Sequence, residues 1–527
     1  MLGDQTLRAR WRLPSGPRER ITPGRSRQGS FREADVTPID TATLSESREF
    51  SPWRARHRFA VSALTTTGAV MTLPDFFTWF EERRRAADFA AVRVPLAGLT
   101  NWSAEPETGN LTHDSGGFFT IEGLEVHTDF GRVPHWSQPI IRQPEIGVLG
   151  ILVKEFNGVL HCLMQAKVEP GNVNGLQLSP TVQATRSNHT RKHRGAATRY
   201  LEYFLGPRRG RVLVDVLQSE QGSWFLGKRN RHMVVEVLED VEVHENFCWL
   251  TLGQLYQLLW TDNLVNMDVR SVLSCIPVGP IDHAGSPSSD PFQDALHRSV
   301  DPAASDPETS DPDVARDITS WLVEEKARHT LVRRSIPLNR VRGWVRTSDS
   351  IVHESGRYFS VIGLDVRANN REVARWSQPI VAPAGEGLAA LLVRRWDGVL
   401  HALVQARVAA GAVDVVEIGP TVHVTPVNVQ HLPREQWPPY LDYVLTVAPE
   451  QIRYDVRLSE EGGRLYHAVT RYLVIEVADD FPHDTPSNYT WTTVHRLASL
   501  LRHSYYLNVE TRTLVACLTA LWARRAG

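Results

Sequence analysis

The residues best suited to chemistry follow a long apolar run in the first half of the chain. Lys167, Glu169 and Asn172 lie close together there, and a segment rich in arginine and lysine follows at 186–194. Cations beside a carboxylate and amides in one cavity would suit a diphosphate joined to a hydroxylated ring. The alternative is a solvated basic loop, which is the commoner explanation for a charge run on its own.

The chain contains two copies of one domain. Trp-Ser-Gln-Pro-Ile at 136–140 recurs at 376–380, and 376 − 136 = 240. Toward the ends of the copies the offset becomes 242, as between Trp102 and Trp344. A repeat of this length that occurs twice is a duplicated domain, because solenoid units are about 20–50 residues long and number at least three.

The copies differ at the polar loop. The second copy keeps a cation there, Arg407, but has alanine at 409 and 412, and its downstream segment lacks the run of basic residues. We therefore expect the first copy to hold the active pocket and the second copy to hold a structural or vestigial one.

Helices and alternating strands must position these residues. Residues 74–82 have helical periodicity with acidic side chains in the first turns, which favours a helix start. Asn157-Gly158 between two apolar runs predicts a hairpin with a two-residue turn, and strands are predicted at 212–217 and 232–238. Each copy is therefore predicted to be an α+β domain, a mixed sheet flanked by helices.

Composition predicts the boundaries of the domains. Residues 1–70 lack apolar periodicity and predict a disordered N-terminal extension. The two copies are predicted at 71–278 and 314–527, and the Pro, Ser and Asp content of 279–313 predicts a solvated linker between them.

Several classes of function are disfavoured. The formal net charge of −2 offers no field for nucleic acid or an anionic membrane, and no apolar run approaches the roughly 18 residues of a membrane-spanning helix. Four cysteines without a Cys-x-x-Cys pair suggest reduced thiols and a cytoplasmic protein. Neither a dinucleotide fingerprint nor a phosphate-binding loop is present. We expect no metal at His189 and His193, because the second copy lacks both histidines.

Several long motifs resemble the NDP-hexose 2,3-dehydratases of deoxysugar pathways. The resemblance covers about 73–521, and it rests on 136–141, 147–158, 165–172, 178–185 and 262–267. It implies tandem Nudix-like domains that form homodimers and act on dTDP-4-keto-6-deoxyglucose during antibiotic biosynthesis. The Nudix hydrolase signature, a glycine followed by a helix ending Arg-Glu-x-x-Glu-Glu, is missing, so the fold is implied without metal-dependent pyrophosphate cleavage.

The implied chemistry requires no cofactor. The C4 ketone acidifies the hydrogen at C3, a base removes it, and the C2 hydroxyl leaves with the help of an acid. The product is a 3,4-diketo-2,6-dideoxy sugar nucleotide. Two alternatives stay open: another nucleotide-sugar enzyme, such as an epimerase or ketoreductase, and a non-catalytic nucleotide-sugar binding module.

The resemblance and the residue types together suggest roles for particular side chains. Glu169 or His113 would be the base, and Tyr200 would be the acid or the donor to the C4 oxygen. A structural role is open for His113 and Tyr200, because His353 and Tyr440 match them in the second copy. The predicted substrate-binding residues are Lys167, Arg186 and Arg191 for phosphate, Trp102 and Trp136 for thymine, and Gln138, Asn172 and Asn188 for hydroxyls.

Overall fold

A computed structural model describes residues 52–67, 70–190, 195–206, 210–279, 289–305 and 317–524. We call 71–278 the first repeat and 317–524 the second repeat. Each repeat has α+β structure, as predicted, and the described residues form two five-stranded and two seven-stranded sheets. None of the described helices is long and apolar enough to cross a membrane.

The strands of the first repeat are β1 (Phe89–Val94), β2 (Trp102–Ala104), β3 (Leu111–His113), β4 (Thr120–Thr128), β5 (His135–Arg142), β6 (Gly147–Phe156), β7 (Val159–Val168), β8 (Leu176–Ser179), β9 (Val182–Ala184), β10 (Arg211–Ser219), β11 (Arg229–Glu236) and β12 (Phe247–Thr251). The helices up to its end are α1 (Pro52–Leu64), α2 (Leu73–Ala86), η2 (Leu96–Gly98), α3 (Arg186–His189), η3 (Leu201–Tyr203), α4 (Leu252–Leu258) and α5 (Met267–Ser274).

The strands of the second repeat are β13 (Leu331–Ile336), β14 (Trp344–Arg346), β15 (Ser350–His353), β16 (Phe359–Ala368), β17 (Arg375–Pro383), β18 (Gly387–Trp396), β19 (Val399–Arg407), β20 (Glu417–Pro420), β21 (Val422–Val424), β22 (Ile452–Ser459), β23 (Val469–Glu476) and β24 (Tyr489–Thr493). The remaining helices are α6 (Pro291–Val300), α7 (Pro302–Ser305), α9 (Ile318–Arg328), η4 (Leu338–Arg340), η5 (Pro426–Asn428), η6 (Arg434–Gln436), α10 (Leu441–Thr446), η7 (Pro449–Gln451), α11 (Val494–Ser499), η8 (Leu500–Arg502) and α12 (Val509–Ala523).

The seven-stranded sheets are mixed. In the first repeat the order is β10-β11-β6-β7-β12, with β8 on β7 and β9 on β6, and β11 runs parallel to β6. The predicted hairpin is confirmed: Asn157 and Gly158 join β6 to β7 with φ angles of 50° and 80°. Both residues lie in the left-handed region, which this turn type requires.

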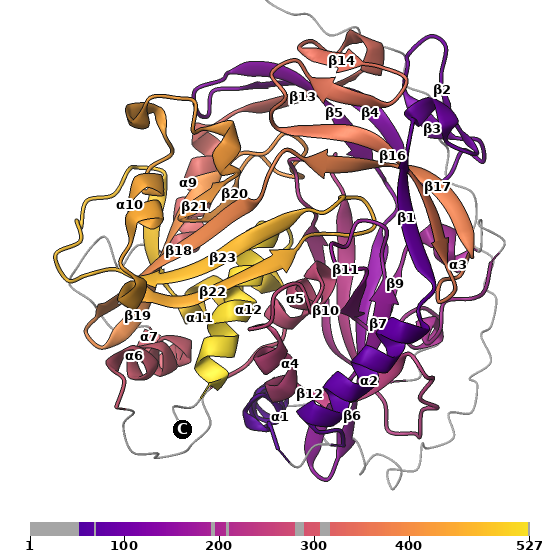
Figure 1. The fold of residues 1–527 in the computed structure, drawn as a ribbon. Coiled ribbons are helices and arrows are strands. Elements are labelled where there is room, and N and C mark those ends of the chain that lie inside the picture. Colours follow the sequence, from indigo (N-terminus) through magenta and orange to yellow (C-terminus); the bar gives the residue numbers. More distant parts are fainter. Residues whose placement is uncertain are drawn as a thin grey trace, which may run out of the picture. The chain divides into compact units, whose positions relative to one another are not determined.

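The five-stranded sheets exchange strands between the repeats. β1 of the first repeat pairs antiparallel with β16 of the second, and β13 of the second repeat pairs with β4 of the first (Figure 1). Glycine is needed at both joints. A Cβ at Gly123 would lie 2.8 Å from the Ile336 carbonyl oxygen, and one at Gly363 would lie 2.7 Å from that of Val94. Each repeat therefore completes a sheet of the other.

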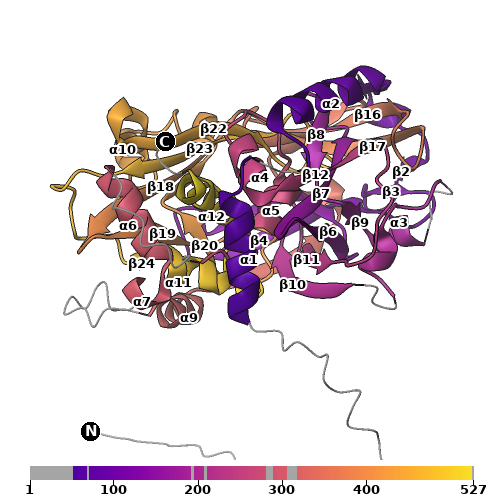
Figure 2. The ribbon, with the colours of Figure 1, turned by 90° about the horizontal axis from the view of Figure 1, so that it is seen from below.

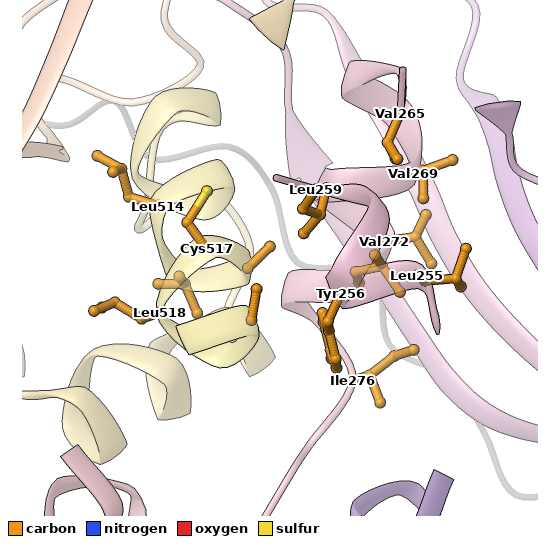
Figure 3. Close-up of a cluster of buried hydrophobic side chains, with 14 of the residues drawn as sticks. Leu255, Tyr256, Leu259, Val265, Val269, Val272, Ile276, Leu514, Cys517 and Leu518 are labelled. Atoms are coloured by element: carbon orange, nitrogen blue, oxygen red, sulfur yellow. The ribbon is translucent and has the colours of Figure 1, made fainter. Parts of the chain in front are cut away.

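Helices α4 and α5 of the first repeat pack against α12 of the second repeat (Figure 2), and α1 packs against α4 and β7. Leu514, Cys517 and Leu518 of α12 belong to the same apolar cluster as Tyr256 and Leu259 of the first repeat. Figure 3 shows α12 beside the first-repeat segment that carries Tyr256 and Leu259. Apolar burial of this kind contributes roughly 25 cal/mol per Å², so the core that stabilises one repeat also stabilises the other.

Two buried arginines add reciprocal hydrogen bonds between the repeats. Arg270 on α5 donates to the Ser459 carbonyl at 2.8 Å, and Arg512 on α12 donates to the Ser219 carbonyl at 2.6 Å. Both acceptors end strands that lead toward the cavities described below. The arginines therefore tie the position of each strand end to a helix of the other repeat.

Two described segments differ from the predicted domain organisation. Helix α1 lies within the predicted disordered extension, yet Phe59, Ala60 and Ala63 are fully buried in the main core. Helix α6 lies within the predicted linker and buries Phe292 and Leu296. The apolar faces of both helices are short and interrupted by polar residues, so the composition of these stretches concealed them. Residues 1–51, 68 and 69 of the extension and part of the linker lie outside the described residues.

Candidate functional site

Residues of both repeats line one large cavity, which we call the first cavity. Its volume is about 990 Å³. The charged and amide side chains that line it include Lys167, Glu169, Gln183, Asn188, Glu220, Lys228, Asn230 and Asp268 from the first repeat, and Arg371, Gln378, Glu461 and Arg464 from the second.

A lysine, a glutamate and a glutamine are joined at the end of β7. Alternation along β7 directs Ala166 and Val168 into the apolar core and Lys167 to the opposite face. Lys167 Nζ donates to Gln183 Oε1 at 2.8 Å, and Gln183 Nε2 donates to Glu169 Oε1 at 2.8 Å. Lys167 and Glu169 are buried, with Nζ and Oε1 3.9 Å apart. Burial lowers the pKa of Lys167.

A tight turn at 461–464 brings second-repeat residues into the first cavity. The Gly171 amide donates to the Gly462 carbonyl at 2.7 Å. A Cβ on Gly462 would lie 2.0 Å from Asn172 Oδ1 and 3.1 Å from Glu169 Cβ, so only glycine fits there. Glu461 and Arg464 thus line the cavity next to the first-repeat loop.

Asn172 supports that contact. Its Nδ2 donates to the Gly175 carbonyl at 3.0 Å, and its buried Oδ1 has no hydrogen-bond partner among the described residues. The described lining residues of the first cavity do not include Asn172. Its observed contacts are those of a residue that shapes the loop.

The two copies of the Trp-Ser-Gln motif line different cavities. Trp376 and Gln378 on β17 line the first cavity. Trp376 Nε1 donates to Gln378 Oε1 at 2.9 Å, and Gln378 Nε2 donates to the Gly463 carbonyl at 2.8 Å. Trp136 and Gln138 line the second cavity instead. The structure therefore does not bring Trp136 and Gln138 together with Lys167.

Further buried ionisable groups lie deeper in the first cavity. Lys228 Nζ donates to the Glu145 carbonyl, and burial lowers the pKa of Lys228 to about 8. Burial raises the pKa values of Glu220 and Asp268. One carboxyl oxygen of Glu220 and one of Asp268 has no hydrogen-bond partner among the described residues. Buried polar atoms normally have partners, so these oxygens are suited to a ligand or a proton.

Aromatic side chains form another wall of the first cavity. Trp102 Nε1 donates to the Ser377 carbonyl at 2.9 Å, and its ring centroid lies 5.3 Å from that of His113. The Arg464 guanidinium lies 4.1 Å from the centre of the Phe119 ring. His113 Nδ1 is 2.8 Å from Ser115 Oγ, and burial lowers the pKa of the imidazole. Trp102 and His113 thus line the cavity that contains Lys167 and Glu169.

The other predicted residues lie in different places. Asn188 lines the first cavity and caps α3, where its Oδ1 accepts from the Thr185 amide at 3.1 Å. Arg186 is exposed, and Arg191 lies outside the described residues. Tyr200 is buried in an apolar cluster, and its hydroxyl donates to the Glu242 carbonyl at 2.7 Å. Among the described residues, the lining of the two cavities does not include Tyr200.

The second cavity, of about 580 Å³, is related to the first by the duplication. At the 240-residue offset, Ala409, Ala468 and Trp224 replace the charged residues Glu169, Lys228 and Arg464, and Gln221 replaces Glu461. Glu460 and Glu510 remain, but Gln221 Nε2 lies 2.8 Å and 3.4 Å from their oxygens. The second cavity has therefore lost several charges, and the amide of Gln221 lies within hydrogen-bonding distance of two of its remaining acids.

The functional candidates that were not anticipated from the sequence include Lys228, Arg371, Glu461 and Arg464. The signal was available, since each differs from its 240-offset counterpart. Among the described residues, the one cluster with metal-ligand spacing is Glu125, His127 and His135. Arg334 already binds Glu125 at 2.8 Å, which opposes the binding of a cation there.

The fold and the cavities define a duplicated α+β protein with one strongly ionic pocket and a counterpart that has fewer charged side chains. A family model described as NDP-hexose 2,3-dehydratase matches residues 73–276 and 315–518. The chain belongs to this family, which confirms the resemblance seen in the sequence.

Curated relatives agree with that assignment. The chain is 52% identical over 470 residues to a dTDP-4-dehydro-6-deoxy-alpha-D-glucopyranose 2,3-dehydratase of Saccharopolyspora spinosa, covering 88% of this chain and 95% of the relative. It is 48% identical over 476 residues to a relative with the same description from Amycolatopsis orientalis, covering 89% and 95%. For another from Streptomyces violaceoruber, identity is 50% over 450 residues, covering 85% and 97%.

Proposed function

We propose that this chain is the enzyme that removes water across C2 and C3 of dTDP-4-keto-6-deoxyglucose, a hydro-lyase reaction. The observation that carries the proposal is the first cavity, in which buried cations and carboxyls meet, together with relatives of about 50% identity that bear this activity in their descriptions. The product is a 3,4-diketo-2,6-dideoxy sugar nucleotide.

Glu169 is the base of the proposed mechanism. It is buried, and the Gln183 amide and the Lys167 ammonium lie on one side of its carboxylate. Removal of the C3 proton leaves negative charge on the C4 oxygen, which a fixed cation such as Lys167 stabilises most in a buried site. The steps require no cofactor, because the substrate's own ketone accepts the electrons.

Arginine and lysine side chains suit the diphosphate. Arg371, Lys228 and Arg464 line the first cavity, and planar guanidinium groups bind phosphate oxygens in pairs. Trp376 takes the stacking role predicted for Trp136, since it lies in the first cavity and its indole is fixed by Gln378. Trp102 and Asn188 remain candidates for thymine and for a hydroxyl.

Finer features follow from the family resemblance and belong to the same proposal. The repeats are tandem Nudix-like domains at 71–278 and 314–527 joined by 279–313, and the matched stretches are compatible with these limits. The enzyme is a cytoplasmic homodimer that supplies deoxysugars for antibiotic glycosides. Four free cysteines fit a reducing compartment.

One assay tests the proposed function. Purified protein is incubated with dTDP-4-keto-6-deoxyglucose without added cofactor, and released thymidine diphosphate from the unstable diketo product is measured. We expect release with time. Turnover that depends on nicotinamide would instead indicate a ketoreductase, and binding without turnover would indicate a binding module.

A further inference from the structure

Glu461 lies in the same buried corner of the first cavity as Glu169, although it belongs to the other repeat. The next residue, Gly462, contacts the Glu169 loop so closely that a Cβ there would lie 3.1 Å from Glu169 Cβ. Arg270 of the first repeat holds the Ser459 carbonyl at 2.8 Å, just before this turn. The position of Glu461 relative to Glu169 is therefore fixed by contacts between the repeats.

The Glu461 carboxyl is only half satisfied. Oε1 accepts a hydrogen bond from the Gly463 amide at 3.2 Å, whereas the buried Oε2 has no partner among the described residues. In the second cavity the equivalent Gln221 uses its amide hydrogens on the neighbouring acids Glu460 and Glu510. An ionised carboxylate cannot donate in that way, whereas a protonated carboxyl in this place has a proton to donate.

We propose that Glu461 donates the proton with which the C2 hydroxyl leaves, while Glu169 removes the proton from C3. Each turnover then uses one carboxyl group from each repeat. This inference rests on the proposed dehydration and names the second proton-transfer group of that reaction.

The step balances. The C3–H bond breaks, Glu169 takes the proton, and the electron pair passes to the C4 oxygen as an enolate. The C4 carbonyl then re-forms. The electrons of the C3–C4 double bond move to form the C2–C3 double bond, and the C2–O bond breaks. The departing oxygen takes the proton of Glu461 and leaves as water. The enol then gains a proton at C2 and loses one from O3, and a proton passes from Glu169 to Glu461 through solvent.

The electrostatics of the cavity agree with this division of roles. Burial and then the charge of Glu169 raise the pKa of Glu461 to about 8, with Arg464 opposing the shift. Glu461 therefore holds its proton at neutral pH, as an acid requires. A buried carboxyl that keeps its proton at neutral pH is suited to act as a general acid.

A matched pair of variants tests the proposal. Glu461→Gln installs the residue that stands at Gln221, its counterpart in the other repeat. Glu417→Gln is the control, because Glu417 is a buried carboxyl of the second cavity and its counterpart is Gln177. Both are assayed in the full chain with substrate carrying deuterium at C3. Loss of deuterium to solvent reports the base, and release of thymidine diphosphate reports loss of water.

We expect Glu461→Gln to lower dehydration by about 100-fold or more while deuterium loss stays within about threefold. Glu417→Gln should keep both rates within about twofold. Dehydration that persists in Glu461→Gln, or a parallel fall of both rates, would overturn the role of Glu461. If wild-type protein shows neither deuterium loss nor dehydration, the proposed function itself fails.

A second variant covers the case in which Glu461→Gln does not fold. Glu461→Asp keeps an acid that is one methylene shorter. We expect it to dehydrate about tenfold more slowly than wild type with deuterium loss unchanged. Equal loss of both rates in this variant would overturn the proposal.

Discussion

Replacing Trp376 or Trp136 by phenylalanine should lower stability equally in the two variants but lower catalysis in only one of them. Each indole donates to the glutamine two residues on, Gln378 or Gln138, and both distances are 2.9 Å. Phenylalanine has no indole N–H, so the side-chain oxygen of the glutamine loses this hydrogen bond. A hydrogen bond of this kind contributes about 1 kcal/mol, so both variants should lose about that much free energy of unfolding.

The effect on catalysis should differ between the two variants. Gln378 holds the Gly463 carbonyl at 2.8 Å, in the turn that carries Glu461 into the first cavity. Gln138 holds the Ser223 carbonyl at 2.9 Å, beside the second cavity. If the lost 1 kcal/mol is felt in the transition state, kcat/KM of Trp376→Phe falls about fivefold. That of Trp136→Phe should stay within about twofold.

Urea unfolding gives the stability of both variants, and release of thymidine diphosphate gives kcat/KM. Equal stability losses together with a catalytic loss confined to Trp376→Phe are expected. If Trp136→Phe lowers kcat/KM as much as Trp376→Phe, the assignment of the first cavity as the reacting one is refuted.

Three further predictions follow from the same geometry. Glu169→Gln should lower both dehydration and deuterium loss at C3 by about 100-fold or more while dTDP affinity in calorimetry stays within about threefold; unchanged turnover would remove Glu169 from the mechanism. Burial lowers the pKa of Lys228 to about 8, so its ammonium loses its proton as pH rises through that value. Affinity for dTDP should therefore weaken between about pH 7 and 9, and Lys228→Met should abolish that dependence; a flat wild-type profile would contradict this role. A fragment of residues 52–278 lacks β13, leaves β4 with an open edge and should aggregate, whereas co-expression with 289–527 should restore soluble protein; a soluble, monomeric 52–278 fragment would argue against the strand exchange.

Local patterns were enough to predict much of the fold. The Asn157-Gly158 turn and the strands at 212–217 and 232–238 depend on neighbours in the sequence, and β10 and β11 occupy those stretches apart from a C-terminal end at Glu236. The duplication was also visible, because the repeated motif requires no knowledge of contacts.

The exchange of β1 and β13 could not be predicted in the same way. Strands pair through backbone hydrogen bonds, which are the same for every partner, so alternation along a strand does not identify its neighbour. For this reason the sequence motifs predicted Trp136 and Gln138 in one site with Lys167, whereas Trp376 and Gln378 line the cavity of Lys167 in the structure.

The most informative signal in the sequence is the set of positions at which the two copies differ, which extends beyond the polar loop. Comparison of the copies at the 240-residue offset along the whole chain also singles out Glu461 and Lys228. Their counterparts in the other copy are Gln221 and Ala468. Sequence alone could not show that residues so far apart in the chain share a cavity, since that depends on the contact between Gly171 and Gly462.

The most direct test of the central claim is a crystal structure with dTDP-6-deoxyglucose, which lacks the C4 ketone and cannot react. We expect a hexose ring in the first cavity with its C2–C3 edge between Glu169 and Glu461, within about 3.5 Å of a carboxyl oxygen of each. A ring whose C2 and C3 face away from both acids, or a sugar held against Trp136 with none in the first cavity, would contradict it.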